Sequence, residues 1–158
     1  MVLLPFFQWV ESSSVGAMVR NSAYWFPLIE AVHLLGLAVI GGAVLIVDMR
    51  MLGWIMKRQP VALLAEDAEP WLVGSLIVML VSGGLLFASE AVKCFYNLAF
   101  WVKMVSLVLA MSYTFTVRRK VSHAAEGQVS PGMTRLVAII SLVLWSGVGF
   151  GGRGIGFY

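Results

Sequence analysis

The chain has 158 residues, of which 60% are apolar and only 12% are charged, and its mean hydropathy is +0.91. Soluble domains carry about 25% charged residues, so 11 basic and 8 acidic side chains are too few to cover a water-facing globule of this size. The composition therefore predicts an integral membrane protein. A single cysteine, Cys94, excludes an internal disulfide scaffold. The net charge of +3 comes from scattered Lys and Arg, which argues against nucleic-acid binding.

Four apolar stretches are long enough to cross a bilayer as helices, which takes about 20 residues. They run from about 24 to 47, 71 to 89, 98 to 117 and 136 to 152. Their connections are short: a polar, acidic stretch at 57–70, a turn around Tyr96-Asn97 and a basic stretch at 118–131. Short connections make successive helices antiparallel neighbours. We therefore expect one all-α membrane domain over residues 1–158, folded as a four-transmembrane-helix antiparallel bundle.

Residues 1–22 precede the first apolar stretch. They lack the positive start of a signal peptide, and Gln8 and Glu11 interrupt any continuous apolar core. Phe6, Phe7 and Trp9 followed by polar residues are typical of a helix that lies on the membrane surface. The sequence therefore predicts a short N-terminal interfacial helix.

The distribution of basic residues predicts the orientation, because Lys and Arg concentrate on the cytoplasmic side. Seven lie in or beside the first and third connections: Arg50, Lys57, Arg58, Arg118, Arg119, Lys120 and Arg135. Three lie on the opposite side: Arg20, Lys93 and Arg153. We therefore expect a multi-pass protein with its first and third connections in the cytoplasm and both termini on the opposite side of the membrane.

Ionisable side chains gather in the outer half of the predicted bundle. At about 1.5 Å per residue, His33 lies roughly 14 Å and Lys103 roughly 8 Å below the outer boundary. Glu30 lies one turn before His33, and Lys93 and Arg153 flank the same end. Because an ionisable group within a span costs roughly 2.5–3.5 kcal/mol on insertion scales, each of these groups needs a partner.

His33 is the only histidine at membrane depth, and two roles are open for it. A neutral imidazole can bond to Glu30 or to a hydroxyl on a neighbouring helix, or it can be an axial haem ligand in a dry bundle interior. His123 follows the basic connection on the other side and cannot reach the same iron. Lys103 likewise has two roles, an ion pair with Glu30 or Glu90 or, if neutral, metal ligation.

A second axial ligand would have to come from Lys103, Met104, Met79 or another subunit, because no further histidine is available. The small residues offer a separate prediction. Ala38 and Gly42, and Gly147 and Gly151, are spaced four apart, which permits close helix packing in lipid. Two such small-residue faces, on the first and fourth helices, are more than one small bundle needs for its own helix packing, so we expect a homo-oligomer.

Several short motifs carry a resemblance to a known family: Glu30-x-x-His33-x-x-Gly36, Asp48-x-Arg50-x-x-Gly53, Asn97-x-x-Phe100-x-x-Lys103 and Gly152-Arg153-Gly154-Ile155. From about residue 23 to 158 the chain resembles the small bacterial four-helix membrane proteins of the DUF6644 type, which include a hexameric membrane haemoprotein with b-type haems. The resemblance implies haem b, a homo-oligomer and the inner membrane. It also implies that His33 is an axial ligand, that Lys103 is a second ligand or propionate partner, and that Arg153 clamps a propionate.

The expected function is therefore that of a haem b-binding oligomeric membrane protein that passes or stores electrons near the periplasmic face, with the redox partner and any catalysed reaction left open. Glu30, His33, Lys93, Lys103 and Arg153 are the candidate cofactor-binding residues. A small proton, ion or solute transporter using Glu30, His33 and Lys103 is one alternative. A structural subunit of a larger membrane complex is another. No phosphate-binding, dinucleotide-binding or hydrolase motif is present.

Overall fold

The computed structural model describes residues 3–125 and 127–156, which form helices joined by short connections. The helices are α1 (Leu4–Glu11), α2 (Ser14–Arg20), α3 (Trp25–Met51), α4 (Val61–Ser89), α5 (Ala91–Tyr96), α6 (Leu98–Tyr113), the π-helical turn η1 (Thr114–Arg118), α7 (Arg119–Ser122) and α8 (Pro131–Ile155). Four helical stretches are long and apolar enough to cross a membrane: α3, α4, the continuous run from α6 to α7, and α8. The predicted all-α fold with four spanning helices is confirmed.

The helices extend beyond the apolar stretches that predicted them. α4 begins at Val61, directly after Pro60, so most of the predicted connection at 57–70 is helical and Pro70 lies inside α4. α6 continues through η1 into α7, so the basic connection begins only at His123. Hydropathy marks where a helix contacts lipid, whereas a polar helix can continue past the bilayer boundary. This difference explains why α4 begins earlier, and the run from α6 to α7 ends later, than the apolar stretches predicted.

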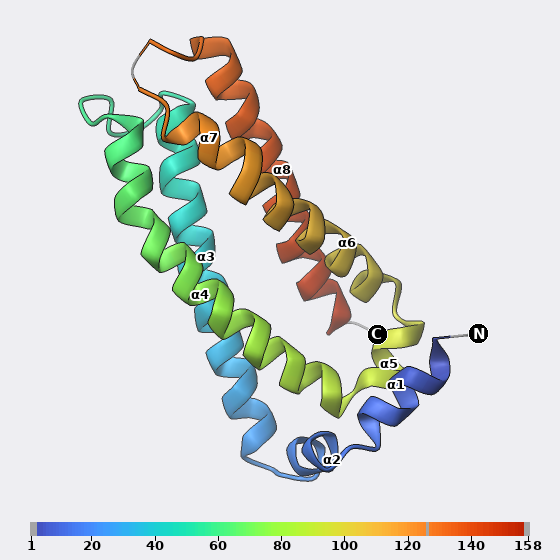
Figure 1. Cartoon of the computed structure of the whole chain (residues 1–158). Coiled ribbons are helices and arrows are strands. Elements are labelled where there is room, and N and C mark those ends of the chain that lie inside the picture. The colour runs from blue at the N-terminus through green and yellow to red at the C-terminus, as the bar shows by residue number, and fades with distance from the viewer. Residues whose placement is uncertain (1–2, 126, 157–158) are drawn as a thin grey trace.

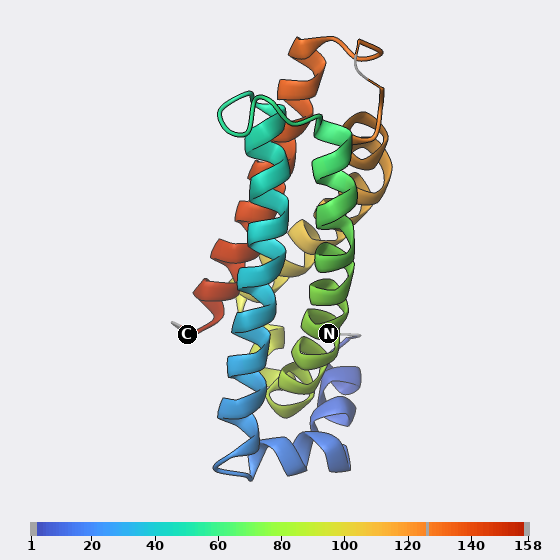
Figure 2. The ribbon, with the colours of Figure 1, turned by 90° about the vertical axis from the view of Figure 1, so that its left-hand side faces the viewer.

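The bundle consists of two helix pairs, α3 with α4 and α6 with α8 (Figures 1 and 2). Small residues allow close approach within each pair. A Cβ on Gly36 of α3 would lie 3.1 Å from Met79 of α4, and a Cβ on Gly151 of α8 would lie 3.0 Å from the Lys103 backbone of α6. Gly147 makes a similar approach to Ser106. The predicted role of Gly147 and Gly151 in close helix packing is confirmed.

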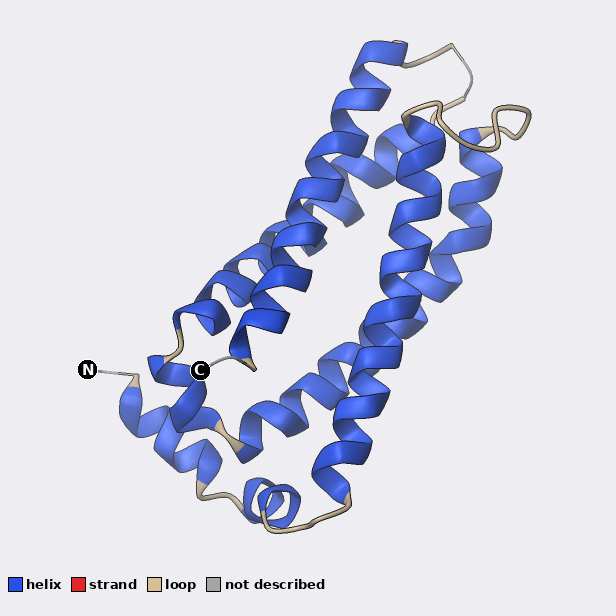
Figure 3. Ribbon diagram, turned by 180° about the vertical axis from the view of Figure 1, so that it is seen from behind, coloured by secondary structure: helices blue, strands red, loops and turns tan. Residues whose placement is uncertain are grey.

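The two pairs converge at one end of the molecule and diverge towards the other (Figure 3). We call these the Arg118 end, where α3 stops and α4 and α8 start, and the Lys103 end, where α1, α2 and α5 lie. A buried apolar cluster joins α3, α4 and α8 at the Arg118 end: Val47, Met51, Leu52, Leu64, Ala65, Val137 and Ala138. At the Lys103 end the ring of Phe87 on α4 stacks on that of Phe100 on α6, with 5.5 Å between the ring centroids, and the space beside this contact is available for a site.

The N-terminal segment forms two helices where one was predicted, because Ser13 caps α2 by accepting a hydrogen bond from Gly16 N at 3.2 Å. The segment is fastened to the α4–α5 junction. Glu11 Oε2 accepts from Val92 N at 2.6 Å, and Arg20 donates to the Ser89 carbonyl at 3.1 Å. On α1, Trp9 is exposed, which suits a helix in the membrane interface.

Candidate functional site

Two adjoining cavities lie between the helix pairs at the Lys103 end, with volumes of about 400 and 450 Å³. Both fall in the range of ligand pockets. They share a wall formed by His33, Met79, Gly83, Phe87, Phe100, Lys103 and Val148. We call the first the apolar cavity, because its other walls include Phe7, Trp101 and Trp145.

The second, which we call the polar cavity, collects the candidate residues. Its lining includes Glu30, His33, Lys93, Lys103 and Arg153, which come from α3, α5, α6 and α8. These five residues were selected from the sequence as cofactor-binding candidates, and the fold places all five around one cavity. Their role there remains a prediction.

His33 projects from α3 onto α4. Its Nδ1 lies 2.9 Å from the Ser82 hydroxyl, so the expected bond to a hydroxyl on a neighbouring helix is confirmed, while Glu30 is not its hydrogen-bond partner. A Cβ on Gly83 would lie 3.0 Å from His33 Cε1, so the missing side chain at this position makes room for the ring. Ser82 and Gly83 together hold one edge of the imidazole against α4.

Lys103 is half-buried against α8, where a Cβ on Gly152 would lie 3.6 Å from its Nζ. Within the described residues, its ammonium forms no hydrogen bond or ion pair. Glu90 pairs instead with Lys93, at 3.9 Å. The predicted ion pair of Lys103 with Glu30 or Glu90 is therefore wrong, because Lys93 lies on the helix that follows Glu90 directly. An amine without a protein partner faces both cavities.

Cys94 also lines the polar cavity, and the sequence argument considered it only as a possible disulfide. Burial and the nearby Glu90 carboxylate raise the pKa of this thiol to about 11, so it stays protonated at neutral pH. A lone cysteine carries no pattern in the sequence that would have placed it here.

The cavity walls include glycines with open space above them. A Cβ added to Gly84 in the apolar cavity or Gly149 in the polar cavity would meet no atom within 4 Å. Across residues 3–125 and 127–156, no three His, Cys, Asp or Glu side chains converge as a metal-binding group. The site therefore offers flat walls and isolated donors rather than a metal centre made by the protein alone.

A second polar cluster lies at the Arg118 end. Arg118 Nε donates to Asp48 Oδ1 at 2.7 Å, and the two side chains are 6% and 0% exposed. Arg118 also donates to the Val44 carbonyl at 3.4 Å, and the buried Ser141 hydroxyl lies beside the same Asp48 carboxylate. The placement of Arg118 in a solvated connection was wrong, because its helix continues past the predicted end.

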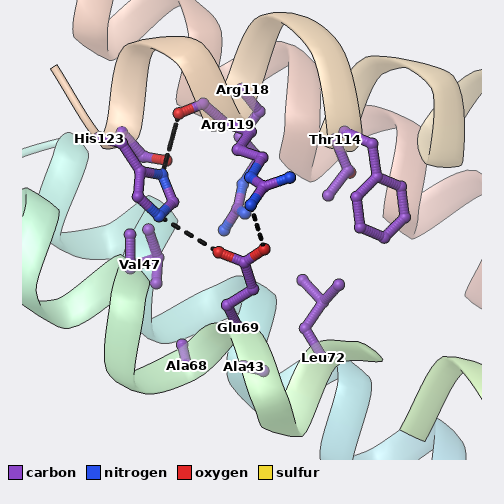
Figure 4. A pocket seen from close by; sticks show the side chains of 12 residues that line it. Ala43, Val47, Ala68, Glu69, Leu72, Thr114, Arg118, Arg119 and His123 are labelled. Atoms are coloured by element: carbon purple, nitrogen blue, oxygen red, sulfur yellow. Dashed lines mark hydrogen bonds and ion pairs between the residues drawn. The ribbon is translucent and has the colours of Figure 1, made fainter. Parts of the chain in front are cut away.

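Beside this pair, Glu69 of α4 lies between Arg119 and His123 (Figure 4). It accepts from Arg119 Nη2 at 2.9 Å and faces His123 Nε2 at 3.3 Å. Arg119 is more than half exposed. His123 thus lies at the end opposite to His33, as predicted, and the cluster ties α4 to α7.

The comparisons with known proteins complete the description of the site. The profile of a family of unknown function (DUF6644) matches residues 6–158. Comparisons with curated proteins and with solved structures gave no match. The matched range contains every residue that lines the two cavities.

Proposed function

Because the chain belongs to the DUF6644 family, whose function is unknown, we propose from its site that it is a haem b-binding integral membrane protein that passes or stores electrons. One observation carries the proposal. The only imidazole within the four spans lines the same cavity as the cations Lys93, Lys103 and Arg153. An axial ligand beside groups that can neutralise carboxylates is the donor set that a propionate-bearing haem requires.

The absence of a metal-binding group among the described residues is compatible with this proposal, since a haem brings its own ring nitrogens and needs only one or two protein ligands. His33 would supply the first ligand, and Met79, Met104 or Lys103 the second. When bound, haem supplies one-electron chemistry, and the protein adjusts it through ligand identity, burial and nearby charge. The aromatic walls would shield a bound haem from water, and Lys93, Lys103 and Arg153 would bind its propionates.

The glycines support the fit of a flat ligand. Gly84 and Gly149 face open space on the walls of the two cavities, where any larger side chain would occupy the volume. Gly83 leaves room for the His33 ring in the wall that the cavities share. A thin, rigid ring system could lie against the wall at these glycine positions.

The experiment is an absorption spectrum of the detergent-purified protein with haem quantified as the pyridine complex. We expect a Soret band that His33→Ala removes or strongly shifts, while His123→Ala, at the opposite end, leaves it unchanged. In Lys103→Met, a retained but altered low-spin spectrum would indicate a thioether in place of an amine, whereas an unchanged spectrum would assign Lys103 to the propionates. Unchanged haem content in His33→Ala would refute the site.

Glu30, His33 and Lys103 also line one cavity in a way that a transporter could use. A folded protein that remains colourless after haem loading would favour that function. In that case, proteoliposome flux that depends on Glu30 would separate transport from a structural role.

Assembly and location belong to the same proposal. A Cβ added to Gly42, on the predicted Ala38–Gly42 face, would meet no atom within 4 Å. This face therefore makes no close helix contact within the protomer at Gly42. We expect a homo-oligomer, a hexamer if it follows the haemoprotein of the resemblance, in the bacterial inner membrane with periplasmic termini. A monomeric mass by light scattering, or cytoplasmic activity of a reporter fused after Tyr158, would contradict these two expectations respectively.

A further inference from the structure

The Ser82 hydroxyl has one hydrogen and three neighbouring polar atoms. Its Oγ lies 2.6 Å from the Val78 carbonyl, 3.5 Å from the Met79 carbonyl and 2.9 Å from His33 Nδ1. Carbonyl oxygens only accept hydrogen bonds. The single hydrogen is therefore committed to the short bond with Val78, and the lone pairs of Oγ remain for His33.

This count favours one direction for the bond between the two helices. Since Oγ accepts, His33 Nδ1 must donate, and in a neutral imidazole the other nitrogen then carries no hydrogen. We propose that Ser82 is a positioning residue that holds neutral His33 as the Nδ1–H tautomer, so that Nε2 keeps its lone pair for a ligand in the cavity. The identity of that ligand as haem rests on the proposed function, but the tautomer does not.

The reverse arrangement is disfavoured by the same distances. If Ser82 donated to Nδ1, the 2.6 Å contact with Val78 would bring two acceptors together without a hydrogen. The single N–H hydrogen of the neutral imidazole would then lie on Nε2, so Nε2 could not act as a ligand. Gly83 lets the Cε1 edge of the ring lie against α4, which keeps Nδ1 beside Ser82.

The chain contains a matched control two helical turns earlier on the same face of α4. Ser75 is buried like Ser82, and its hydroxyl bonds to the Trp71 carbonyl at 2.7 Å and lies 3.2 Å from the Leu72 carbonyl. It contacts no histidine. Ser75→Ala therefore removes the same kind of intrahelical bond as Ser82→Ala and leaves the contact with His33 in place.

The decisive experiment is ¹⁵N NMR of the histidine side chains in ligand-free, ¹⁵N-histidine-labelled protein reconstituted in liposomes, with His123→Gln used to assign the signals. Protonated and unprotonated ring nitrogens have well-separated shifts. We expect His33 to show a protonated Nδ1 and a bare Nε2 in the unmodified protein and in Ser75→Ala. Ser82→Ala should populate the Nε2–H form, and Ser82→Thr, which retains the hydroxyl, should restore the original pattern.

A hydrogen on Nε2 in the unmodified protein, alone or together with one on Nδ1, would overturn the inference. So would an identical tautomer in Ser82→Ala. A second measurement tests the consequence: haem titration should give an affinity about 10–100-fold lower for Ser82→Ala than for Ser75→Ala, and equal affinities would remove the positioning role. If the unmodified protein takes up no haem, the proposed function fails, while the NMR result still decides the role of Ser82.

Discussion

The buried pair of Arg118 and Asp48 offers the sharpest test of how the two helix pairs are joined. Arg118→Met keeps the length of the side chain and removes its charge and its bond to Asp48. The Asp48 side chain is fully buried, so its carboxylate would be left without a counter-ion. Removing one partner of a buried ion pair typically costs about 3–5 kcal/mol.

That cost converts into a measurable shift. For chains of this size, 1 kcal/mol corresponds to roughly 2–4 °C in Tm, so Arg118→Met should lower Tm in mild detergent by about 6–20 °C. The double variant Asp48→Leu with Arg118→Met removes both charges together. It should recover most of the loss, because replacing a buried pair by apolar residues is often close to neutral.

Arg119 provides the control, because it is the next residue in the chain and its bridge to Glu69 is partly exposed to solvent. Arg119→Met should cost about 1 kcal/mol or less. Thermal unfolding followed by circular dichroism measures all three variants. Equal Tm values for the Arg118 and Arg119 variants, or a double variant as unstable as Arg118→Met alone, would refute the assignment of Arg118 and Asp48 as a buried coupling between the helix pairs.

Three further outcomes are expected from single positions. Gly151→Ala should destabilise the protein by about 1–3 kcal/mol, because its Cβ would lie 3.0 Å from the backbone of α6. In the same melting assay, Gly149→Ala should be neutral or stabilising by up to about 1 kcal/mol, because its Cβ would meet open space. At pH 8 the thiolate fraction of Cys94 should be about 100-fold below that of a thiol with a pKa of 9.0. Alkylation followed by mass spectrometry should therefore be slow and accelerate as the pH approaches 11; fast labelling of folded protein at pH 7 would contradict the burial. Gly84→Leu should reduce haem uptake measured by titration, and Gly74→Leu, on the same helix but outside both cavities, should not; equal uptake by the two variants would contradict the use of the apolar cavity.

Much of the site was predictable because intramembrane ionisable residues are rare and costly. The positions of Glu30, His33 and Lys103 along their helices sufficed to place them in the same half of the bundle. The hydroxyl partner of His33 was predictable as a class but not as Ser82, because the rotation of α4 relative to α3 is set by packing. Gly36 and Gly83 allow α3 and α4 to approach closely, but the sequence does not show which residues pack against them.

The misplacement of Arg118 in a connection has a physical origin. Arg118 was assigned to a connection because apolar character ends at Val117, yet a helix ends where its backbone bonds and caps end. The partner that makes burial of Arg118 tolerable, Asp48, lies 70 residues earlier in the chain. A single sequence contains no signal for that pairing.

The wall contributed by α1 has a thermodynamic consequence. Phe7 is only 5% exposed, packs against Phe87 and Phe100, and lines the apolar cavity, although its helix lies outside the spanning bundle. A molecule that fills this cavity contacts α1 and adds to the free energy that holds the helix in place. Because such coupling is reciprocal, docking of α1 must strengthen retention of the occupant by the same factor. Loading of the cavity and ordering of the amino-terminal helix are thus linked equilibria.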